Sequence, residues 1–225
     1  MKTLMPCNDM TVDKAYIITL KNHELSEMLS RRCQLSCERV EQKYEIWDAF
    51  DGTSGEIVIP ENLRNQNWIN WIKQYDTELS ITEVAVYLSH ASLWAHCIEV
   101  NMPIVILEHD SIMVMPYTNH HGYNQIVYLG GREQASGWAV TPIPPMAQKN
   151  ANYKFILRAH AYAIDPLSAK NLLAHTLKYG INESLDITIR TDVFGVIQGG
   201  FYAYDLPHEE TTITKRKKAS NGQER

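Results

Sequence analysis

The first fifty residues contain two hydrophobic runs of strand length that flank a segment with helical spacing. Residues 14–20 are apolar at nearly every position, which predicts a strand that is buried on both faces of a sheet. Four apolar side chains follow at helical spacing: Leu25, Met28, Leu29 and Cys33. Residues 44–47 predict a second, short strand. The order strand, helix, strand favours a parallel pair of strands.

A longer amphipathic segment begins at Ser80. The sequence Ser80-Ile81-Thr82-Glu83 predicts a capping box, in which the Ser80 side chain binds the Glu83 amide and the Glu83 carboxylate binds the Ser80 amide. An apolar stripe then follows at helical spacing: Val84, Leu88, Ala91, Ala95 and Ile98. A neighbouring face carries polar chemistry: Glu83, Tyr87, His90 and Trp94. Asn101 and Pro103 are expected to end this helix.

Strands and one further helix are predicted in the rest of the chain. Asp165-Pro166 supplies an N-cap and a tolerated first-turn proline, so a helix is expected to start there and to stop at Gly180 in the left-handed conformation. The predicted strands are 102–107, 124–129, 155–164, 186–189 and 201–204. Residues 53–79 and 132–152 are expected to be loop-rich and irregular.

Alternating strands and helices, with acidic residues at strand ends, predict an α/β fold with an open, mostly parallel sheet flanked by helices. In such sheets, ligands bind outside the carboxyl ends of the strands. We expect a single domain over residues 14–206, after an N-terminal tail of residues 1–13 and before a polar and basic tail of residues 207–225. A chain of 225 residues is long enough to bury a sizeable core in one domain.

The charge distribution restricts the kind of partner. The formal net charge is −5, and the last eleven residues, Lys215–Arg225, contribute +4, which leaves −9 for the rest. An acidic body disfavours an extended nucleic-acid surface, which needs a basic stripe. The cysteines lack further ligands at zinc-motif spacing, so reduced and mostly buried thiols are expected at Cys7, Cys33, Cys37 and Cys97.

No segment has the pattern of a signal peptide or a transmembrane helix. Met1–Asp13 lacks an apolar run, and the longest apolar run, Met102–Leu107, is far too short to cross a bilayer. We therefore expect a cytoplasmic protein, at the inner membrane face if its acceptor is lipid-linked and in the host cytoplasm if a phage encodes it. The pattern gives no indication of the oligomeric state.

Two carboxylates and an imidazole directly follow the predicted central strand. Glu108, His109 and Asp110 come after Ile104–Leu107, so the strand delivers them to the edge of the sheet. A divalent metal bound to a diphosphate takes one or two carboxylates, with substrate phosphates completing its shell. Asp110 is the first candidate ligand and Glu108 the second. Taken alone, the three residues are more typical of a strand that ends in solvated side chains.

Four blocks set these residues in a wider pattern. Ala15–Leu20 is an opening strand that ends Ile-Thr-Leu, and Asp48–Gly52 reads Asp-Ala-Phe-Asp-Gly. Thr82–Trp94 contains Leu-Ser-His and ends Leu-Trp, and Ile106–Asp110 reads Ile-Leu-Glu-His-Asp. In this order they resemble the blocks of glycosyltransferase family 25, which includes lipooligosaccharide and collagen galactosyltransferases. Weaker matches continue the resemblance to about residue 206: Tyr128–Gly130, His160–Ile164, Ala169–Leu173 and Leu185-Asp186.

The resemblance implies a GT-A type fold that binds a nucleotide sugar, usually a UDP-sugar, with a divalent metal, Mn²⁺ or Mg²⁺. It implies a hexosyl- or pentosyltransferase that acts by direct displacement with inversion, for which one general base must activate the acceptor hydroxyl. The expected acceptor is a cell-surface glycan such as lipooligosaccharide.

The resemblance and the predicted fold also suggest residue roles. Candidate metal ligands are Asp110, Glu108 and, from the C-terminal side, His208. The candidate donor-binding residues lie at strand ends and on the Leu-Ser-His helix: Thr19, Leu20, Asp48, Gly52, Ser89, Glu108 and His109. Asp186 is the first choice of general base and Asp192 the second, and Glu83 and His90 are further catalytic candidates.

Several of these residues also have a purely structural interpretation. His90 is equally typical of a hydrogen-bonded core histidine. Asp186 and Asp192 are each compatible with capping a turn. A surface histidine beside two glutamates is the simpler interpretation of His208.

Two departures from the family pattern affect the interpretation. His109 occupies the middle position of the family's Glu-Asp-Asp, and imidazole is a softer ligand than carboxylate. If this side chain points away from the metal, little changes. If it is a ligand, metal affinity or metal choice shifts. The stretch between Asp110 and Asn124 is also shorter than is common in the family, which leaves the acceptor side undetermined.

Two alternative functions remain open. The same chemistry could act on 5-hydroxymethylcytosine in phage DNA, or on a sugar already attached to it, an idea motivated by the compact size and the basic tail. The acidic body counts against it, and the base would have to be extruded from the helix. A non-catalytic relative that binds a partner or a sugar is the other alternative, motivated by His109.

Overall fold

The computed structural model describes residues 11–72, 78–118, 122–133, 140–141, 146–150, 153–156 and 158–205. Its helices are α1 (Glu24–Arg39), α2 (Ile81–Val100), α3 (Pro166–Tyr179) and α4 (Leu185–Thr188), with short 3₁₀ turns at Glu61–Leu63 and Asn67–Trp71. The strands of the first half are β1 (Ala15–Thr19), β2 (Tyr44–Asp48), β3 (Ile104–Glu108) and β4 (Ser111–Met113). The later strands are β5 (Ile126–Glu133), β6 (Val140–Thr141), β7 (Met146–Asn150), β8 (Tyr153–Ile156), β9 (Ala161–Ile164) and β10 (Val196–Asp205).

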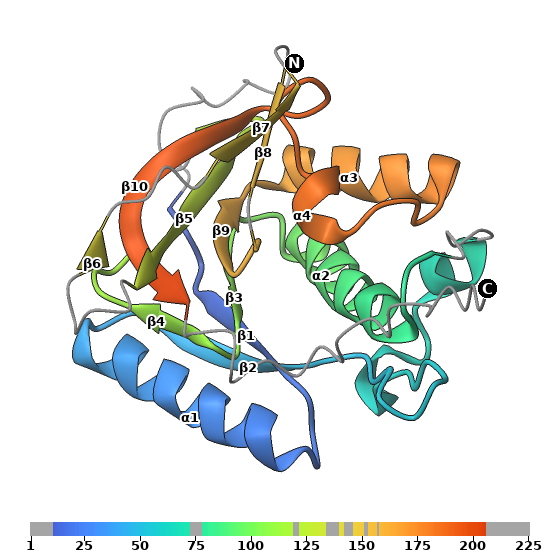
Figure 1. Ribbon diagram of the computed structural model, residues 1–225, viewed down its shortest axis with the longest axis horizontal. Coiled ribbons are helices and arrows are strands. Elements are labelled where there is room, and N and C mark those ends of the chain that lie inside the picture. The colour runs from blue at the N-terminus through green and yellow to red at the C-terminus, as the bar shows by residue number, and fades with distance from the viewer. Residues whose placement is uncertain are drawn as a thin grey trace, which may run out of the picture.

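One mixed sheet forms the centre of the molecule, with strand order β2-β1-β3-β9-β5-β10-β4 and β6 paired to β5 (Figure 1). β1 is parallel to β2 and β3, and β10 is parallel to β5. β9 runs antiparallel to both of its neighbours, so it is the single reversed strand between β2 and β10. The predicted open, mostly parallel α/β sheet flanked by helices is therefore confirmed.

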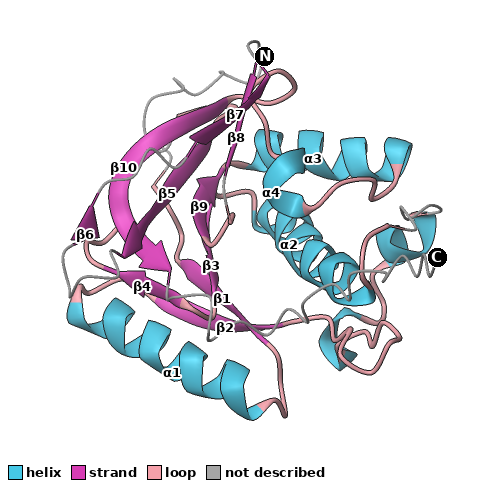
Figure 2. Cartoon of the chain, viewed as in Figure 1, coloured by secondary structure: helices cyan, strands magenta, loops and turns pink. Residues whose placement is uncertain are grey.

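The two faces of the sheet are covered by different helices, as Figure 2 shows: α1 lies on one side, and α2, α3 and α4 lie on the other. Side chains alternate between the two cores along β3. Ile104 and Ile106 pack on the α2 side, and Val105 and Leu107 pack on the α1 side. Continued by one residue, this alternation turns Glu108 toward α2.

The helix termini follow their sequence signals. Ser80 Oγ accepts from the Glu83 amide at 3.2 Å and Glu83 Oε2 accepts from the Ser80 amide at 2.8 Å, so the predicted capping box is confirmed. Asn101 ends α2 in the left-handed conformation. Asp165 caps α3 and also accepts from the Gln125 amide at 2.7 Å, which ties the start of this helix to β5. Gly180 ends α3 with a positive φ of 78° but an extended ψ of −174°, so the expected left-handed stop is wrong in detail.

Two predicted strands are wrong. Residues 155–164 do not form one strand: β8 pairs with β7 outside the main sheet, and β9 belongs to it. Between them Arg158 and Ala159 adopt positive φ values of 67° and 41°, which no continuous strand allows. Residues 186–189 lie mostly in α4, because the chain turns and the Ile189 amide donates to the Leu185 carbonyl. The strand β4 was not predicted, and neither were β6 and β7, which lie in the stretch 132–152 that was expected to be irregular.

The remaining expectations concern thiols, membranes and tails. Cys33, Cys37 and Cys97 are buried and free, as predicted. Within the described part of the chain, no helix combines the length and the apolar character that membrane crossing requires. Cys7, most of the N-terminal tail, and the tail from residue 207 with His208 lie outside the described residues.

Buried His160 makes stability sensitive to acid. Its Nδ1 lies 3.2 Å from the Tyr128 hydroxyl, and burial, assisted by the Arg158 charge, lowers its pKa to about 3. Since an unfolded histidine titrates near pH 6.5, only the unfolded chain gains this proton between pH 6.5 and pH 3. Its protonation should therefore reduce the free energy of unfolding by about 1 kcal/mol per pH unit as the pH falls. Urea unfolding at pH 7.5, 6.5, 5.5 and 4.5 measures this.

The variant His160→Asn keeps a polar group near Tyr128 but removes the titration. Its stability should fall less steeply below pH 6.5 than that of the wild type, while the difference between the two proteins stays constant above pH 7. Parallel curves over the whole range would contradict the assignment.

Candidate functional site

A pocket of about 630 Å³, open to solvent, lies where the carboxyl ends of β1, β2 and β3 meet the first half of α2. Its enclosed cavity volume is about 70 Å³, below the range of about 300–1,000 Å³ that is common for small-molecule sites, so a ligand would also occupy the open mouth. Part of the lining is apolar: Ile18, Leu20, Phe50, Ala85 and Val86. The other residues are polar or small: Ala49, Gly52, Thr53, Thr82, Ser89, His90, Glu108, His109 and Asp110.

The loop after β2 is fixed closely against α2. Ser89 Oγ accepts from the Phe50 amide at 2.9 Å and donates to the Ala85 carbonyl at 2.8 Å. A β-carbon on Gly52 would lie 2.7 Å from the Ile81 carbonyl oxygen, closer than such atoms can approach. The predicted positions Gly52 and Ser89 therefore both line the pocket and set the distance between its walls.

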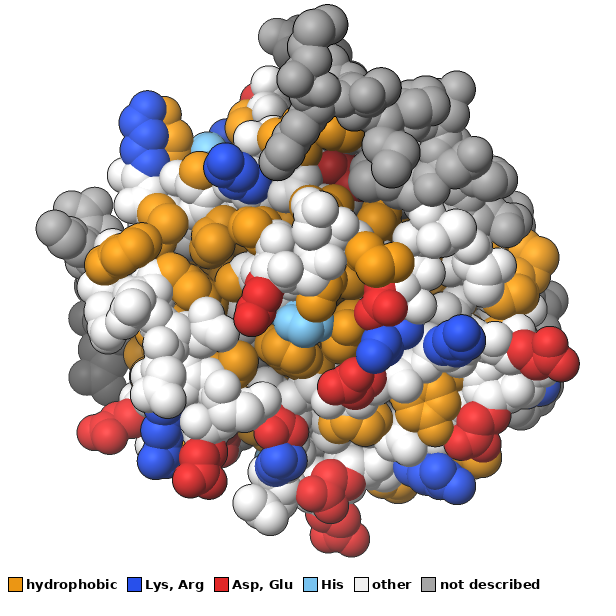
Figure 3. All heavy atoms as spheres, turned by 180° about the vertical axis from the view of Figure 1, so that it is seen from behind, with side chains coloured by type: hydrophobic (Ala, Val, Ile, Leu, Met, Phe, Trp, Pro, Cys, Tyr) orange, Lys and Arg blue, Asp and Glu red, His pale blue; other side chains and the backbone are white. Residues whose placement is uncertain are grey.

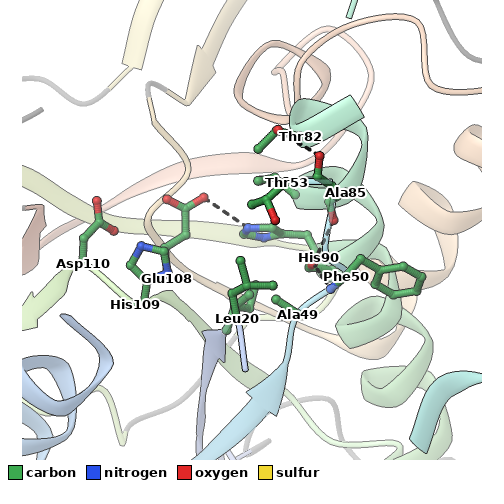
Figure 4. A pocket seen from close by; sticks show the side chains of 14 residues that line it. Leu20, Ala49, Phe50, Thr53, Thr82, Ala85, His90, Glu108, His109 and Asp110 are labelled. Atoms are coloured by element: carbon green, nitrogen blue, oxygen red, sulfur yellow. Dashed lines mark hydrogen bonds and ion pairs between the residues drawn. The ribbon is translucent and has the colours of Figure 1, made fainter. Parts of the chain in front are cut away.

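Glu108 is held by a chain of hydrogen bonds that starts in the core, as Figure 4 shows for its last link. Trp94 Nε1 donates to the Tyr162 hydroxyl at 2.9 Å, and this hydroxyl lies 2.9 Å from His90 Nδ1. His90 Nε2 lies 3.3 Å from Glu108 Oε1. An ionised carboxylate only accepts, so His90 then donates from Nε2 and accepts the Tyr162 proton at Nδ1.

Burial shifts the pKa of both partners. His90 is fully buried, which lowers its pKa to about 3, so the imidazole is neutral at pH 7. Burial also raises the pKa of the Glu108 carboxyl well above its usual range, although a quarter of the side chain remains accessible. The negative charges of Asp110 and Asp186 raise it further, and the guanidinium of Arg158 lowers it.

His109 also lines the pocket, but it makes its hydrogen bond on the α1 side of the strand end. Its Nδ1 lies 3.1 Å from Ser26 Oγ on α1, and this hydroxyl also accepts from the Leu20 amide at 2.9 Å. Burial, with a smaller effect of the His23 charge, lowers the pKa of His109 to about 4. A neutral imidazole thus joins the ends of β1 and β3 to α1, while Glu108 contacts α2.

The charges of other acidic groups act on Glu108 at the end of β3. Asp110 and Asp186 both lie near enough to Glu108 for their charges to affect its pKa, and Asp186 Oδ1 accepts from Ser184 Oγ at 2.7 Å. The first-choice general base, on α4, therefore lies within electrostatic range of Glu108. Arg158 supplies a positive charge to the same region and forms an ion pair with buried Asp205 at the end of β10.

The acidic residues near Glu108 fit a divalent cation that ligand phosphates help to hold. Mutual repulsion among Glu108, Asp110 and Asp186 is what a cation would relieve, and carboxylates are the hard ligands that Mn²⁺ and Mg²⁺ prefer. Among the described residues, however, no three His, Cys, Asp or Glu side chains converge closely enough to hold an ion by themselves. A cation here would take one or two protein carboxylates and complete its shell with ligand phosphates.

Other predicted positions lie around the pocket or away from it. Leu20 lines it, whereas the Thr19 hydroxyl is buried 2.7 Å from Ser30 Oγ. Asp48 forms an ion pair with Lys21 at 2.6 Å. Glu83 is engaged in the capping box, and Asp192 pairs with Arg190 at 3.2 Å. Their predicted roles stay predictions.

Sequence reasoning missed three groups that shape this site. Ser26 and Arg158 lie in no motif, and each reaches the site only through the fold: Ser26 on α1, and Arg158 by the left-handed turn before β9. Thr53 lines the pocket one residue after the Asp-Gly turn. The Asp-Gly turn itself was a signal that pointed to Thr53.

The Tyr162 hydroxyl serves two buried partners, so its removal is a test of the hydrogen-bond chain. Tyr162→Phe leaves the Trp94 indole N–H and His90 Nδ1 without this partner, and we expect a loss of about 1–3 kcal/mol of unfolding free energy in urea. Tyr44→Phe removes an exposed bond to Glu38 and should change stability by less than about 0.5 kcal/mol. Equal effects of the two variants would contradict a role for the buried chain.

Comparison with known proteins identifies the family. A sequence model described as glycosyltransferase family 25 (LPS biosynthesis protein) matches residues 12–126, just over half of the chain. The matched part contains the whole pocket together with Glu108, His109 and Asp110, and ends before Asp186 and Asp192. A search of individual curated proteins found no match. The chain belongs to glycosyltransferase family 25.

Proposed function

We propose that this protein transfers a hexosyl or pentosyl group from a nucleotide sugar, most simply a UDP-sugar, to a hydroxyl of a cell-surface glycan such as lipooligosaccharide. The observation that carries the proposal is the pocket at the carboxyl ends of three parallel strands, bordered by Glu108 and Asp110. Parallel α/β sheets bind nucleotides at this position. The family description, an LPS biosynthesis protein, supports the class of acceptor.

The pocket has two chemically different ends for such a donor. The apolar side chains Leu20, Phe50 and Val86 suit a planar base, and the hydroxyls of Thr53 and Thr82 suit ribose oxygens. The acidic end at Glu108 and Asp110 repels a diphosphate unless a cation lies between them. The donor diphosphate is therefore proposed to bind at this end together with Mn²⁺ or Mg²⁺.

Glu108 and Asp110 would hold the cation, which would neutralise the charge that develops on the leaving diphosphate. The chain's own contribution is orientation: the bond from neutral His90 fixes the Glu108 carboxylate, and the Ser26 contact fixes His109 on the α1 side. Because His109 makes its contact on that opposite side, the replacement of the family's middle acid is compatible with a working metal site.

Asp186 is proposed as the general base of an inverting displacement. It lies on α4 close enough to Glu108 for its charge to act there, whereas Asp192 is paired with Arg190. A carboxylate at this place can accept the acceptor's hydroxyl proton as that oxygen attacks the anomeric carbon. We propose a cytoplasmic reaction, at the inner membrane face when the acceptor is lipid-linked.

The two alternatives gain no specific support. On the face shown in Figure 3, basic side chains are scattered among acidic ones and form no continuous stripe among the described residues, as a nucleic-acid surface would require. The basic tail that motivated a DNA acceptor lies outside the described residues. Binding without catalysis was motivated by His109, whose contact with Ser26 gives it a structural role compatible with activity.

The first test is release of free nucleotide from a panel of nucleotide sugars, with Mn²⁺, with Mg²⁺ and with a chelator. We expect metal-dependent release from one donor, and Asp110→Asn should lower it by about 100-fold or more, because the leaving diphosphate loses its counter-charge. Glu99→Gln removes an exposed acid from the same molecule at the far end of α2 and should retain wild-type release. No release and no nucleotide binding with any donor would refute the proposal.

Asp186→Asn and Asp192→Asn separate the two candidate bases. We expect Asp186→Asn to lower transfer to an acceptor by about 100-fold or more, the usual contribution of a general base, while nucleotide binding measured by calorimetry is retained. Asp192→Asn should retain most of the transfer, because this carboxylate contacts Arg190. The reverse result would assign the base to Asp192.

A further inference from the structure

A second pocket opens on the α2 side of the sheet, between the end of α3, the loop that follows it, and α4. It encloses about 1040 Å³ including its open mouth, and the side chains that give it chemical character are Tyr87, His175, Tyr179, Asn182, Glu183 and Arg190. None of these residues lies in the acidic strand end, and only Tyr87 lies in the part of the chain that the family match covers. No role has been assigned to this pocket.

Aromatic rings form one side of this pocket. Tyr179 is half-exposed at the rim, and its ring centroid lies 4.7 Å from that of His175 at an interplanar angle of 51°. His175 is fixed in turn by an edge contact with Phe194 at 5.5 Å. A half-exposed ring that is held in place can stack against a ligand, but the Lys178 ammonium lies over this ring, 4.7 Å from its centroid, and must move aside for a ligand to stack there.

The opposite side supplies paired polar groups, Arg190 with the carboxylates of Glu183 and Asp192, and their net charge of −1 is balanced by Lys178 beside Tyr179. Arg190 Nη1 donates to Glu183 at 2.6 Å, and its Nε lies 3.2 Å from Asp192. A guanidinium with two carboxylate partners attracts an added anion poorly, but its N–H groups and the carboxylate oxygens can serve hydroxyl groups, which both donate and accept. The lining therefore favours a neutral polyhydroxylated ligand over a phosphate.

The short helix α4 connects this pocket with the candidate active site. Thr188 lines the second pocket, and Asp186, two residues earlier on the same helix, acts on the pKa of Glu108. On α2, Tyr87 lines the second pocket and His90, one helical turn later, lines the first. A chain molecule bound in the second pocket would therefore lie beside the helix that carries the proposed base.

We propose that the second pocket is a saccharide-binding subsite for the acceptor, in which a neutral sugar ring stacks on Tyr179 and its hydroxyls bind the Glu183–Arg190 pair. The inference rests on the proposed transfer reaction and adds the ligand class that the acceptor side selects. A sugar ring has an apolar C–H face and a rim of hydroxyls, which matches the two sides of this pocket.

Saturation-transfer NMR on the full chain tests the subsite. The probes are methyl α- and β-glucoside, methyl α- and β-galactoside, lactose, maltotriose, and the neutral oligosaccharide fraction released from a lipooligosaccharide by mild acid. We expect at least one probe to bind. Tyr179→Ala should raise the dissociation constant of that probe about three- to tenfold, the range for loss of an aromatic contact. Tyr123→Ala removes another exposed tyrosine, next to Asn124 at the opposite end of α3, and should bind as the wild type does.

A second variant covers the case in which Tyr179→Ala does not fold. Val193 is half-exposed at the rim, so Val193→Trp should fold and should block the pocket, with loss of saturation transfer. Excess UDP with Mn²⁺ should leave the saccharide signal in place, because the two pockets are separate. The proposal is overturned if no probe binds, if both variants bind like the wild type, or if UDP displaces the saccharide.

These outcomes are distinct from those of the nucleotide-release assay. Nucleotide release without saccharide binding would leave the transferase function intact and remove the subsite. Saccharide binding at Tyr179 without nucleotide release would retain the subsite and remove the proposed transfer reaction.

Discussion

The arrangement of the site depends on one partly buried contact, in which His90 Nε2 on α2 meets Glu108 Oε1 at the end of β3. A carboxylate that is about three-quarters buried loses much of the water that would normally solvate it, and a neutral imidazole is a donor that adds no charge of its own. The Tyr162 hydroxyl and the Trp94 indole fix the imidazole from behind. The orientation of a pocket residue is therefore set by core residues that no ligand touches.

The end of β3 contacts helices on both sides of the sheet, because successive side chains alternate between the two faces. Glu108 continues the face of Ile104 and Ile106 toward α2, and His109 turns to Ser26 on α1. An acid at the middle position would need a partner of its own on the α1 side, and histidine can take that contact while neutral. The replacement of the family's middle acid by His109 therefore affects the packing of α1 more directly than it affects the carboxylates that face the pocket.

Local signals were sufficient for the elements that build the pocket at the ends of β1, β2 and β3. The capping box at Ser80, the apolar run before Glu108 and the Asp-Gly turn each specify a short segment whose place follows from parallel-sheet rules. The failures lie where backbone conformation was decided by tertiary contacts. The positive φ values at Arg158 and Ala159 split a predicted strand. Two of the charges that act on Glu108, those of Arg158 and Asp186, come from segments about fifty to eighty residues later.

The two halves of the chain carry different information about function. The family match ends at residue 126, after the pocket and its acids are complete, and the sheet is then finished by β9 and β10, which are not covered. β9 supplies Tyr162 to orient Glu108, and α4 brings Asp186 to the same acid. Residues of the second half therefore influence the first half through Glu108, and most of the residues that line the second pocket, among them Tyr179, also lie in the second half. Such a division would allow the proposed acceptor side to vary in sequence while the proposed donor side retains its motifs, provided that the contacts to Glu108 are kept.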